Sequence, residues 1–590
     1  MKQPRATALA VVSVTAALGA PAAAHAAKVP TASGEGGAAA TVDEIATQAA
    51  IRALERGGNA VDASVAAAGV LGVTEPFSAG IGGGGFMVIR RGSDGRVTTI
   101  DHREKAPARM TPDSFIENGK PLPFNDARYS GRSVGVPGTV AGWDVALRRY
   151  GTWTLDQALK SGVDVARRGF EIDQTFFDQV QGNVAYFDDL PATRALYLDP
   201  DGTPRDVGTR LRNRRLAHTY RLISRYGPRA FYRGRVADAM VGAVNTPPVA
   251  PGVEHVWRPG VMTRGDLRRY TAPERKPVRV GYRDYDVYGM APPSSGGSTI
   301  GEILKIMRGF ELRGGSREAA FHAFFEASRL SFADRNAYLA DPEYFDVPLR
   351  GLLSGSFAGE RRSLIGPSAA NRVVEAGDPY DDQGDVKPPA AASASIERNR
   401  STTHLVVSDD DGNVVSYTFT IESTGGSGIV VPKYGFLLNN ELTDFNFDST
   451  THPNRVEGGK RPRSSMAPTI VTRNDRPVLA VGSPGGSTII TTVAQILFDR
   501  LELRTPLPQA IAAPRATQRN GASTAAEPAF LTSPEGRALA LAPYNHRFTT
   551  ISPPEIGAVT AIEFGRRGRM LAAAEPTRRG GGSAMVVRER

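Results

Sequence analysis

A hairpin that begins directly after a linker-like stretch is the feature that most constrains this chain. Residues 376–395 read AGDPYDDQGDVKPPAAASAS, and the surrounding residues 367–401 form the clearest linker in the sequence. Residues 403–421 then read THLVVSDDDGNVVSYTFTI, two alternating strands around an Asp-Gly-Asn turn. The fold must therefore contain a well-formed strand whose first residues follow a segment that is too rich in Pro, Ala and Asp to pack.

The hairpin places two hydroxyl groups side by side. Counting equally in both directions from Asp411 pairs Thr402 with Thr420. Cross-strand partners have Cβ atoms about 4.5–5.5 Å apart, so the two side chains are expected to be neighbours. Thr–Thr pairs also occur simply because they stabilise sheets. The pairing alone therefore does not indicate catalysis.

The position of the linker indicates a second role for Thr402. If the Ser401–Thr402 bond breaks, Thr402 gains a free α-amine beside its own hydroxyl. An α-amine has a pKa of about 7.7–8.0, so much of it is neutral near pH 7–8 and accepts the hydroxyl proton. The same hydroxyl can attack the preceding carbonyl and cut the chain. We therefore predict self-cleavage between Ser401 and Thr402, with Thr402 as the nucleophile.

The N-terminal residues predict export. Lys2 and Arg5 precede an apolar run at 8–20, and AHA at 24–26 offers small residues around a cleavage point. The run falls short of the roughly 20 residues that a spanning helix needs, which disfavours a membrane anchor. We predict a signal peptide at 1–27 and a secreted, periplasmic or extracellular protein.

Composition excludes several function classes. The chain has 590 residues and no cysteine, so a large fold without disulfides or thiol catalysis is expected. Eight histidines without a paired spacing predict neither a metal site nor a cofactor. The net charge of +10 comes from scattered arginines, which indicates a solvated surface rather than a nucleic-acid partner.

The sequence predicts sheets covered by helices, with glycine-rich motifs between some of these elements. Residues 43–73 predict two helices broken by Gly-Gly-Asn, and the glycine run at 80–85 precedes a short strand. A phosphate loop would need a following helix and a Lys-Ser/Thr, so close backbone packing is favoured there. GGSTI occurs at 296–300 and again at 485–489, each time before an apolar helix, and spacing alone leaves open which copy lies near Thr402.

A set of ordered motifs points to one family. They are GGNAVDA (57–63), PFSAGIGGGGFM (76–87), DHREKAP (101–107), GVPGTVAGW (135–143), PPSSGG (292–297), TTH (402–404), DGN (411–413), LLNNELTDF (437–445), KRPRSSMAPTIV (460–471) and GSPGGS (482–487). The chain resembles the γ-glutamyltransferases (γ-glutamyltranspeptidases, glutathione hydrolases) over nearly all of its mature length.

The resemblance implies a fold and a reaction. The fold is α+β, an N-terminal nucleophile hydrolase with a four-layer αββα sandwich. One precursor is cut into a large subunit, 28–401, and a small catalytic subunit, 402–590, which remain together as a heterodimer. Thr402 attacks the γ-glutamyl amide of a glutathione-like donor, and water or an amino acid or peptide acceptor resolves the ester.

The resemblance also implies roles for individual residues. Arg103 matches the arginine that binds the donor's α-carboxylate, since a guanidinium group can donate two parallel hydrogen bonds to a carboxylate. The remaining positions are the serine pair that binds the same carboxylate (Ser464, Ser465), the acids that hold the α-ammonium (Glu441, Asp444) and the oxyanion hole (Gly485, Gly486), with Thr420 beside the nucleophile. The simpler interpretations are an Arg103–Glu104 ion pair, a serine turn and solvated acids.

Two departures from the family pattern affect the donor pocket. Glu422 stands where many members have Asn, so three carboxylates would surround the ammonium and raise one another's pKa. The stretch from Asp444 to Ser464 is short, which predicts an open pocket without a full lid. An acylase or amidase of the same fold, acting on glutaryl-type side chains such as those of β-lactams, is the alternative. A secreted binding protein without turnover is a third hypothesis.

Overall fold

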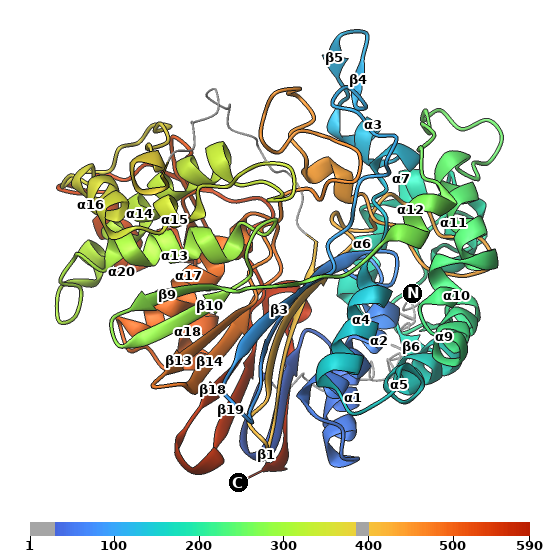
Figure 1. The fold of residues 1–590 in the computed structure, drawn as a ribbon, viewed down its shortest axis with the longest axis horizontal. Coiled ribbons are helices and arrows are strands. Elements are labelled where there is room, and N and C mark those ends of the chain that lie inside the picture. Colours follow the sequence, from blue (N-terminus) through green and yellow to red (C-terminus); the bar gives the residue numbers. More distant parts are fainter. Residues whose placement is uncertain (1–29, 385–400, 590) are drawn as a thin grey trace, which may run out of the picture.

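The protein is a four-layer sandwich in which one 13-stranded sheet lies between two helical layers (Figure 1). The strands on the two sides of β1 face each other and are called here the first and the second sheet. The computed structural model describes residues 30–384 and 401–589. The predicted signal peptide and residues 385–400 of the predicted linker lie outside the described residues. Within the described part, no helix combines the length and apolar character needed to cross a bilayer.

The first sheet carries the hairpin. Its strand order is β8 (Glu274–Arg275), β3 (Val97–Asp101), β2 (Gly84–Arg90), β12 (Val414–Thr420), β11 (Thr403–Asp409) and β1 (Thr31–Thr41), with β20 (Ser583–Glu589) also pairing with β1. Its outer face is covered by α1 (Glu44–Glu55), α2 (Ala60–Thr74), α4 (Thr139–Tyr150), α5 (Leu155–Arg168) and α9 (Arg214–Tyr226).

The second sheet continues from the first through β1. Its order is β19 (Met570–Ala574), β18 (Thr560–Phe564), β14 (Arg476–Gly482), β13 (Thr469–Arg473), β10 (Tyr285–Gly289) and β9 (Val278–Tyr282). β1 pairs with β19 through residues 31–34 and with β11 through residues 37–40. The outer face is covered by α13 (Gly296–Met307), α14 (Arg317–Tyr338) and α17 (Thr488–Leu501).

Small and branched apolar side chains fill the space between the sheets. This inner core includes Ala38, Ala40, Val88, Val406, Ala480 and Ile562. Ser416 Oγ on β12 donates to the Val481 carbonyl on β14 over 3.1 Å, so the two sheets also touch through a polar contact. Facing sheets with alternating inward side chains build this kind of core. The αββα sandwich predicted from the sequence is confirmed.

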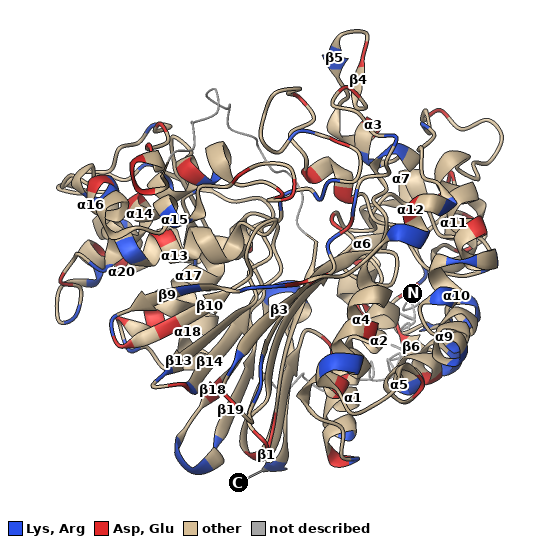
Figure 2. Cartoon of the chain, in the orientation of Figure 1, with Lys and Arg blue, Asp and Glu red and all other residues tan. Residues whose placement is uncertain are grey.

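Smaller elements surround the sandwich. They are β4 (Ile116–Glu117), β5 (Lys120–Pro121), α3 (Phe124–Arg128), η1 (Gly131–Ser133), β6 (Phe170–Glu171), α6 (Gln174–Gln181), α7 (Val184–Phe187), α8 (Pro191–Tyr197), β7 (Arg210–Leu211), α10 (Arg229–Tyr232), α11 (Gly234–Asn245), α12 (Arg264–Arg269), α15 (Leu349–Leu352), α16 (Gly355–Ser363), η2 (Tyr380–Asp382), η3 (Glu441–Asp444), α18 (Leu507–Ala512), β15 (Ala516–Thr517), β16 (Thr524–Ala526), α19 (Pro528–Leu531), α20 (Pro534–Leu539), β17 (Phe548–Thr550), η4 (Arg566–Gly568) and η5 (Arg578–Gly580). Figure 2 shows that Lys and Arg positions and Asp and Glu positions are both spread over these elements.

The glycine run packs backbone against backbone, as predicted. β2 pairs with β12 so that Gly84 lies opposite Thr420. A Cβ atom on Gly83 would lie 1.9 Å from the Thr420 carbonyl oxygen, and one on Gly82 would lie 1.9 Å from the Leu437 carbonyl oxygen. Side chains at these positions would therefore push β2 away from the hairpin strand that ends in Thr420.

The first part of the predicted linker, residues 367–384, is attached to the neighbouring helix α14, although many of its residues are exposed. Tyr380 is only 6% exposed, in a cluster that also contains Tyr338 and Phe357. The Gly377 amide donates to Asp334 Oδ1 over 2.6 Å, which fixes the segment to α14. A Pro- and Asp-rich segment can thus be attached by a single aromatic anchor and a few hydrogen bonds to another element.

Candidate active site

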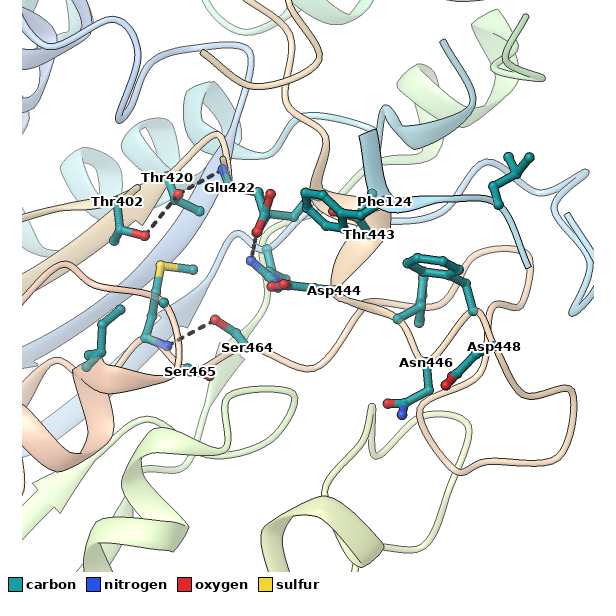
Figure 3. A pocket seen from close by; sticks show the side chains of 18 of the residues that line it. Phe124, Thr402, Thr420, Glu422, Thr443, Asp444, Asn446, Asp448, Ser464 and Ser465 are labelled. Carbon is teal, nitrogen blue, oxygen red and sulfur yellow. Dashed lines mark hydrogen bonds and ion pairs between the residues drawn. The ribbon is translucent and has the colours of Figure 1, made fainter. Parts of the chain in front are cut away.

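Thr402 lies at the start of β11 beside Thr420 at the end of β12. The antiparallel register runs from Thr403 opposite Phe419 to Ser408 opposite Val414, so the predicted pairing continues it by one position. Thr402 Oγ1 donates to Thr420 Oγ1 over 3.1 Å, and Thr420 Oγ1 also accepts from the Glu422 amide over 2.9 Å (Figure 3). The two hydroxyls are therefore held in contact by the hairpin and by the residue that follows it.

The backbone at the predicted cleavage site has an unusual conformation and several anchors. Thr402 has a φ of +101°, a value that L-residues rarely adopt. Ser401 Oγ donates to the Phe77 carbonyl over 2.9 Å. Arg579 Nη1 donates to the Thr402 carbonyl over 3.0 Å, and its Nη2 donates to Ser78 Oγ over 3.1 Å. The chain around Thr402 is thus fixed from both sides.

The second GGSTI copy lies beside Thr402. Gly485 and Gly486 have φ values of +136° and +59°, and Gly486 lines the same pocket as Thr402. They lead into α17, whose N-terminal amides carry partial positive charge. In the first copy, a Cβ on Gly296 would meet Ala467, and one on Gly297 would meet the Met290 carbonyl. The first copy therefore serves packing, and the second adjoins Thr402.

One pocket brings the predicted residues together. It has a volume of about 400 Å³. Its lining includes Thr402, Thr420 and Gly486 together with Arg103, Glu422, Glu441, Asp444, Ser464 and Ser465. Gly485 precedes Gly486 directly. Sequence positions separated by several hundred residues therefore converge on one side of the hairpin.

Arg103 does not form the ion pair with Glu104 that the simplest interpretation of the sequence predicts. Its guanidinium contacts the carboxylates of Glu441 and Asp444 from η3. It also donates to the carbonyls of Pro462 and Arg463, over 3.2 and 3.0 Å. Arg103 and Glu441 are almost fully buried. The residues predicted to bind the α-carboxylate and the α-ammonium of a donor thus form one ion cluster.

Burial and crowding raise the pKa of the acids in this cluster. Burial, reinforced by the charge of Asp444, raises the pKa of Glu422 to about 7, although its contacts with Ser423 and Asn440 oppose the shift. Burial raises the pKa of Glu104 to about 8, against the charge of Arg103. The pKa of Glu441 is also raised, by burial above all. These directions agree with the expectation that crowded carboxyl groups oppose one another's ionisation.

The two serines already have protein partners. Ser464 Oγ accepts from the Met466 amide over 3.1 Å, and Ser465 Oγ accepts from Arg335 Nη2 over 2.7 Å. Arg335 also donates through Nε to Ser295 Oγ over 2.9 Å, linking the PPSSGG and SSMAP motifs to α14. Sequence reasoning missed this arginine because it lies in the middle of an amphipathic helix, where no local pattern marks it.

Arg579 was also missed. It lies in η5 within the sequence PTRRGGGS, which reads as a charged turn. A possible signal was the glycine run after it, because glycines let a chain pass close to another backbone. Nothing local indicated that its side chain reaches Thr402.

The residues directly after Asp444 also line the pocket. Phe445, Asn446, Phe447 and Asp448 line it, and Ser464 is the next residue along the chain to do so. Asp448 is exposed. The lack of a full lid over this pocket stays a prediction.

Comparisons with known proteins agree with this arrangement. The family model described as gamma-glutamyltranspeptidase matches residues 46–585. The glutathione hydrolase proenzyme of Bacillus subtilis (strain 168) is 38% identical over 537 residues, covering 90% of this chain and 88% of that protein. The acylase ACY 1 proenzyme of Pseudomonas sp. (strain V22) is 33% identical over 555 residues, 92% of each. The crystal structure of cephalosporin acylase from Bacillus halodurans matches with a TM-score of 0.81 at 27% identity, covering 97% of this chain and 100% of that one.

Proposed function

The chain belongs to the γ-glutamyltranspeptidase family, and we propose that Thr402 becomes the N-terminal nucleophile of a self-processed γ-glutamyl hydrolase and transferase. Its four-layer sandwich is the N-terminal nucleophile hydrolase fold expected for such an enzyme. The donor is a glutathione-like γ-glutamyl amide. The acceptor is water, an amino acid or a peptide.

Processing uses the same hydroxyl as turnover. Thr402 Oγ1 attacks the Ser401 carbonyl, and the peptide nitrogen leaves as the α-amine of Thr402. Water then hydrolyses the Ser401 ester, which gives a large subunit, 28–401, and a small subunit, 402–590. Because β1 from the large subunit lies between β11 and β19 of the small one, the two remain associated as a heterodimer.

Turnover repeats the attack on a substrate. The α-amine takes the hydroxyl proton as Thr402 Oγ1 adds to the γ-carbonyl. The amides of Gly485 and Gly486 stabilise the developing oxyanion. The leaving amine takes the proton, and water or an amine acceptor then releases the γ-glutamyl group. Arg103, Ser464 and Ser465 bind the donor's α-carboxylate, while Glu422, Glu441 and Asp444 attract its α-ammonium.

The observation that carries the proposal is the contact between Thr402 Oγ1 and Thr420 Oγ1, in a pocket that also contains Gly486. If the Thr402–Thr420 pair only stabilised the sheet, it would not require glycines at the start of a helix beside it. It would also not require a buried cluster of charged side chains in the same pocket.

Intact mass of the purified protein beside a Thr402→Ala variant tests the proposal. We expect two fragments, the smaller beginning at Thr402, and an uncut variant. Processed protein should also release the amine from a γ-glutamyl amide. A single uncut chain in both preparations would remove the proposed nucleophile. Complete processing without any hydrolysis would favour a binding protein.

An acylase acting on glutaryl-type side chains is the second candidate. The similarity to an acylase over 92% of the chain favours it. A glutaryl group lacks the α-amine and gains nothing from Glu422, Glu441 and Asp444. If Glu422→Gln, Glu441→Gln and Asp444→Asn leave the preferred reaction unchanged, the acylase is correct.

The proposal includes export through the predicted signal peptide at 1–27, which places the enzyme outside the cytoplasm. Mass analysis of the mature protein from culture medium or periplasm tests this. An N-terminus near residue 28 is the expected result, and retention of residues 1–27 would contradict it.

A further inference from the structure

The pocket is also lined by residues that the proposed reaction does not use. Figure 3 shows Thr402 on one side of the view, with Glu422 between it and Phe124. Phe124 belongs to a set of apolar residues that line the same pocket and that we call the outer wall: Pro121, Leu122, Pro123, Phe124, Phe445 and Phe447.

Three residues of the outer wall are held in place by a hydrophobic cluster. Leu122 and Phe445 are 6% and 4% exposed and belong to a cluster with Leu442 and Val456. The ring of Phe447 packs against that cluster, with its centroid 5.2 Å from that of Phe115. Pro121 and Pro123 are exposed and Phe124 is half-buried, so these residues offer apolar surface to a ligand group above that fixed base.

The charges around the outer wall exclude an anionic ligand group. Among the described residues that line the pocket, Arg103 is the one cationic side chain. It already forms ion pairs with Glu441 and Asp444. Asp448, exposed beside Phe447, adds a negative charge. A carboxylate at the outer wall would therefore meet repulsion. Converting the donor's α-carboxylate to an amide lets the donor carry an uncharged group toward the outer wall and leaves the α-ammonium to the acids.

We propose that the outer wall is a binding subsite for an uncharged aromatic or bulky aliphatic group carried on the α-carboxamide of the γ-glutamyl donor. The inference rests on the proposed function, because it takes Thr402 as the point of attack and the acids as the site of the α-ammonium. A bare γ-glutamyl group ends at these acids and leaves the outer wall empty. Beside the glutathione-like donors, the site therefore accepts γ-glutamyl amides whose α-carboxyl group is amidated by an apolar residue, with the amide oxygen taking the place of the α-carboxylate at Arg103.

Three donors with one leaving group test the subsite. They are γ-glutamyl-p-nitroanilide, its α-methylamide and its α-benzylamide, compared by kcat/KM on processed protein. The methylamide controls for the lost charge, so the ring is the difference between the two amides. We expect the benzylamide to exceed the methylamide by about tenfold, mainly through KM, since burying and packing one aromatic ring provides about this factor.

Matched variants locate the effect. Phe124→Ala and Phe447→Ala should each reduce the benzylamide-to-methylamide ratio to about threefold or less. Leu541→Ala, which removes a side chain 67% exposed and remote from the pocket lining, should preserve the ratio. A benzylamide no better than the methylamide would overturn the proposal. A ratio that survives both Phe variants would also overturn it.

A binding measurement separates this inference from the proposed function. Glutamate α-benzylamide and α-methylamide lack the scissile amide, so calorimetric titration of processed protein with each reports the subsite without turnover. A tenfold affinity difference that Phe124→Ala abolishes supports the subsite even if none of the anilides is hydrolysed, in which case the proposed γ-glutamyl reaction is wrong. Equal affinities for the two amides would overturn the subsite even in an active enzyme.

Discussion

Arg579 Nη1 donates a hydrogen bond to the carbonyl oxygen of Thr402 over 3.0 Å, and the two residues lie at opposite ends of the predicted small subunit. Arg579 has a φ of +54° and directs its other amino group to Ser78. Burial lowers its pKa, and the charges of Glu75 and Glu555 oppose this effect. The contact fixes the first peptide plane after the proposed nucleophile and places a cation near the future α-amine.

We expect Arg579→Gln to shift the pH profile of the processed enzyme. A neighbouring positive charge disfavours an ammonium, so losing it raises the pKa of the Thr402 α-amine. The charges facing that amine would then be the carboxyl group of Glu422 and, behind the missing guanidinium, Glu75 and Glu555. The acidic limb of kcat/KM should move up by about 0.5–1 pH unit, and activity at pH 7 should fall.

Arg579→Lys keeps the positive charge, so the acidic limb of its kcat/KM profile should stay near the pH found for the unaltered enzyme. Arg567→Gln is the matched control, because Arg567 is exposed and has a similar φ of +58°. Identical acidic limbs in Arg579→Gln and the unaltered enzyme would show that Arg579 only supports the backbone.

We expect Thr420→Val to slow both processing and turnover. The substitution keeps the shape of the side chain but removes the hydroxyl that accepts from Thr402 and from the Glu422 amide. Losing a hydrogen bond at a reacting group costs about 1–3 kcal/mol, or roughly 10–100-fold in rate. Time courses of fragment formation and of amide hydrolysis measure the two effects. Thr420→Ser should restore most of both rates, and an unaffected Thr420→Val enzyme would rule out a role for the hydroxyl.

Glu422 should make donor binding depend on pH. Burial raises its pKa to about 7, so the carboxylate that attracts an ammonium forms as pH rises through that value. KM for a γ-glutamyl donor should fall between pH 6 and pH 8, and Glu422→Gln should lose that dependence. A glutaryl donor, which lacks the ammonium, should not show the fall. The same pH dependence in Glu422→Gln would assign it to another group.

The same shift affects stability in a defined direction. Because the folded-state pKa lies above the unfolded value of 4.5, the folded protein favours the protonated form of Glu422. This contribution is complete below about pH 4.5 and is lost as pH rises through 7. Glu422→Gln should therefore gain about 1–3 kcal/mol of stability relative to the unaltered protein on going from pH 5 to pH 8. Urea unfolding of the Thr402→Ala precursor with and without Glu422→Gln measures this.

Asp62 should be a major source of stability in the first helical layer. This buried carboxylate accepts from the Asn59 amide at the start of α2 and from the amides of Thr152 and Trp153, over 2.9, 3.0 and 3.0 Å. Asp62→Ala leaves these donors unsatisfied and should cost about 2–4 kcal/mol, measured by urea unfolding. Asp156→Ala removes an exposed first-turn acid from α5 and should cost less than about 0.5 kcal/mol. Similar losses in both would contradict a special role for Asp62.

The sequence by itself determined the local features of this protein. The hairpin register follows from alternating side chains on either side of one turn, so Thr402 and Thr420 could be paired by counting residues. The break between α1 and α2 and the close packing at Gly83 and Gly84 follow from the properties of glycine and from helical periodicity. These features depend on residues close together in the chain, or on a glycine run whose conformational meaning is local.

Only the tertiary structure decided what surrounds the hairpin. The partners of Arg103 and the contact from Arg579 depend on how two sheets and two helical layers meet. Each joins residues far apart in sequence, and their local patterns fit either a surface or a buried site. Packing selects one arrangement because a buried charge must find a partner and an apolar face must be covered, and both conditions are met only by the complete sandwich.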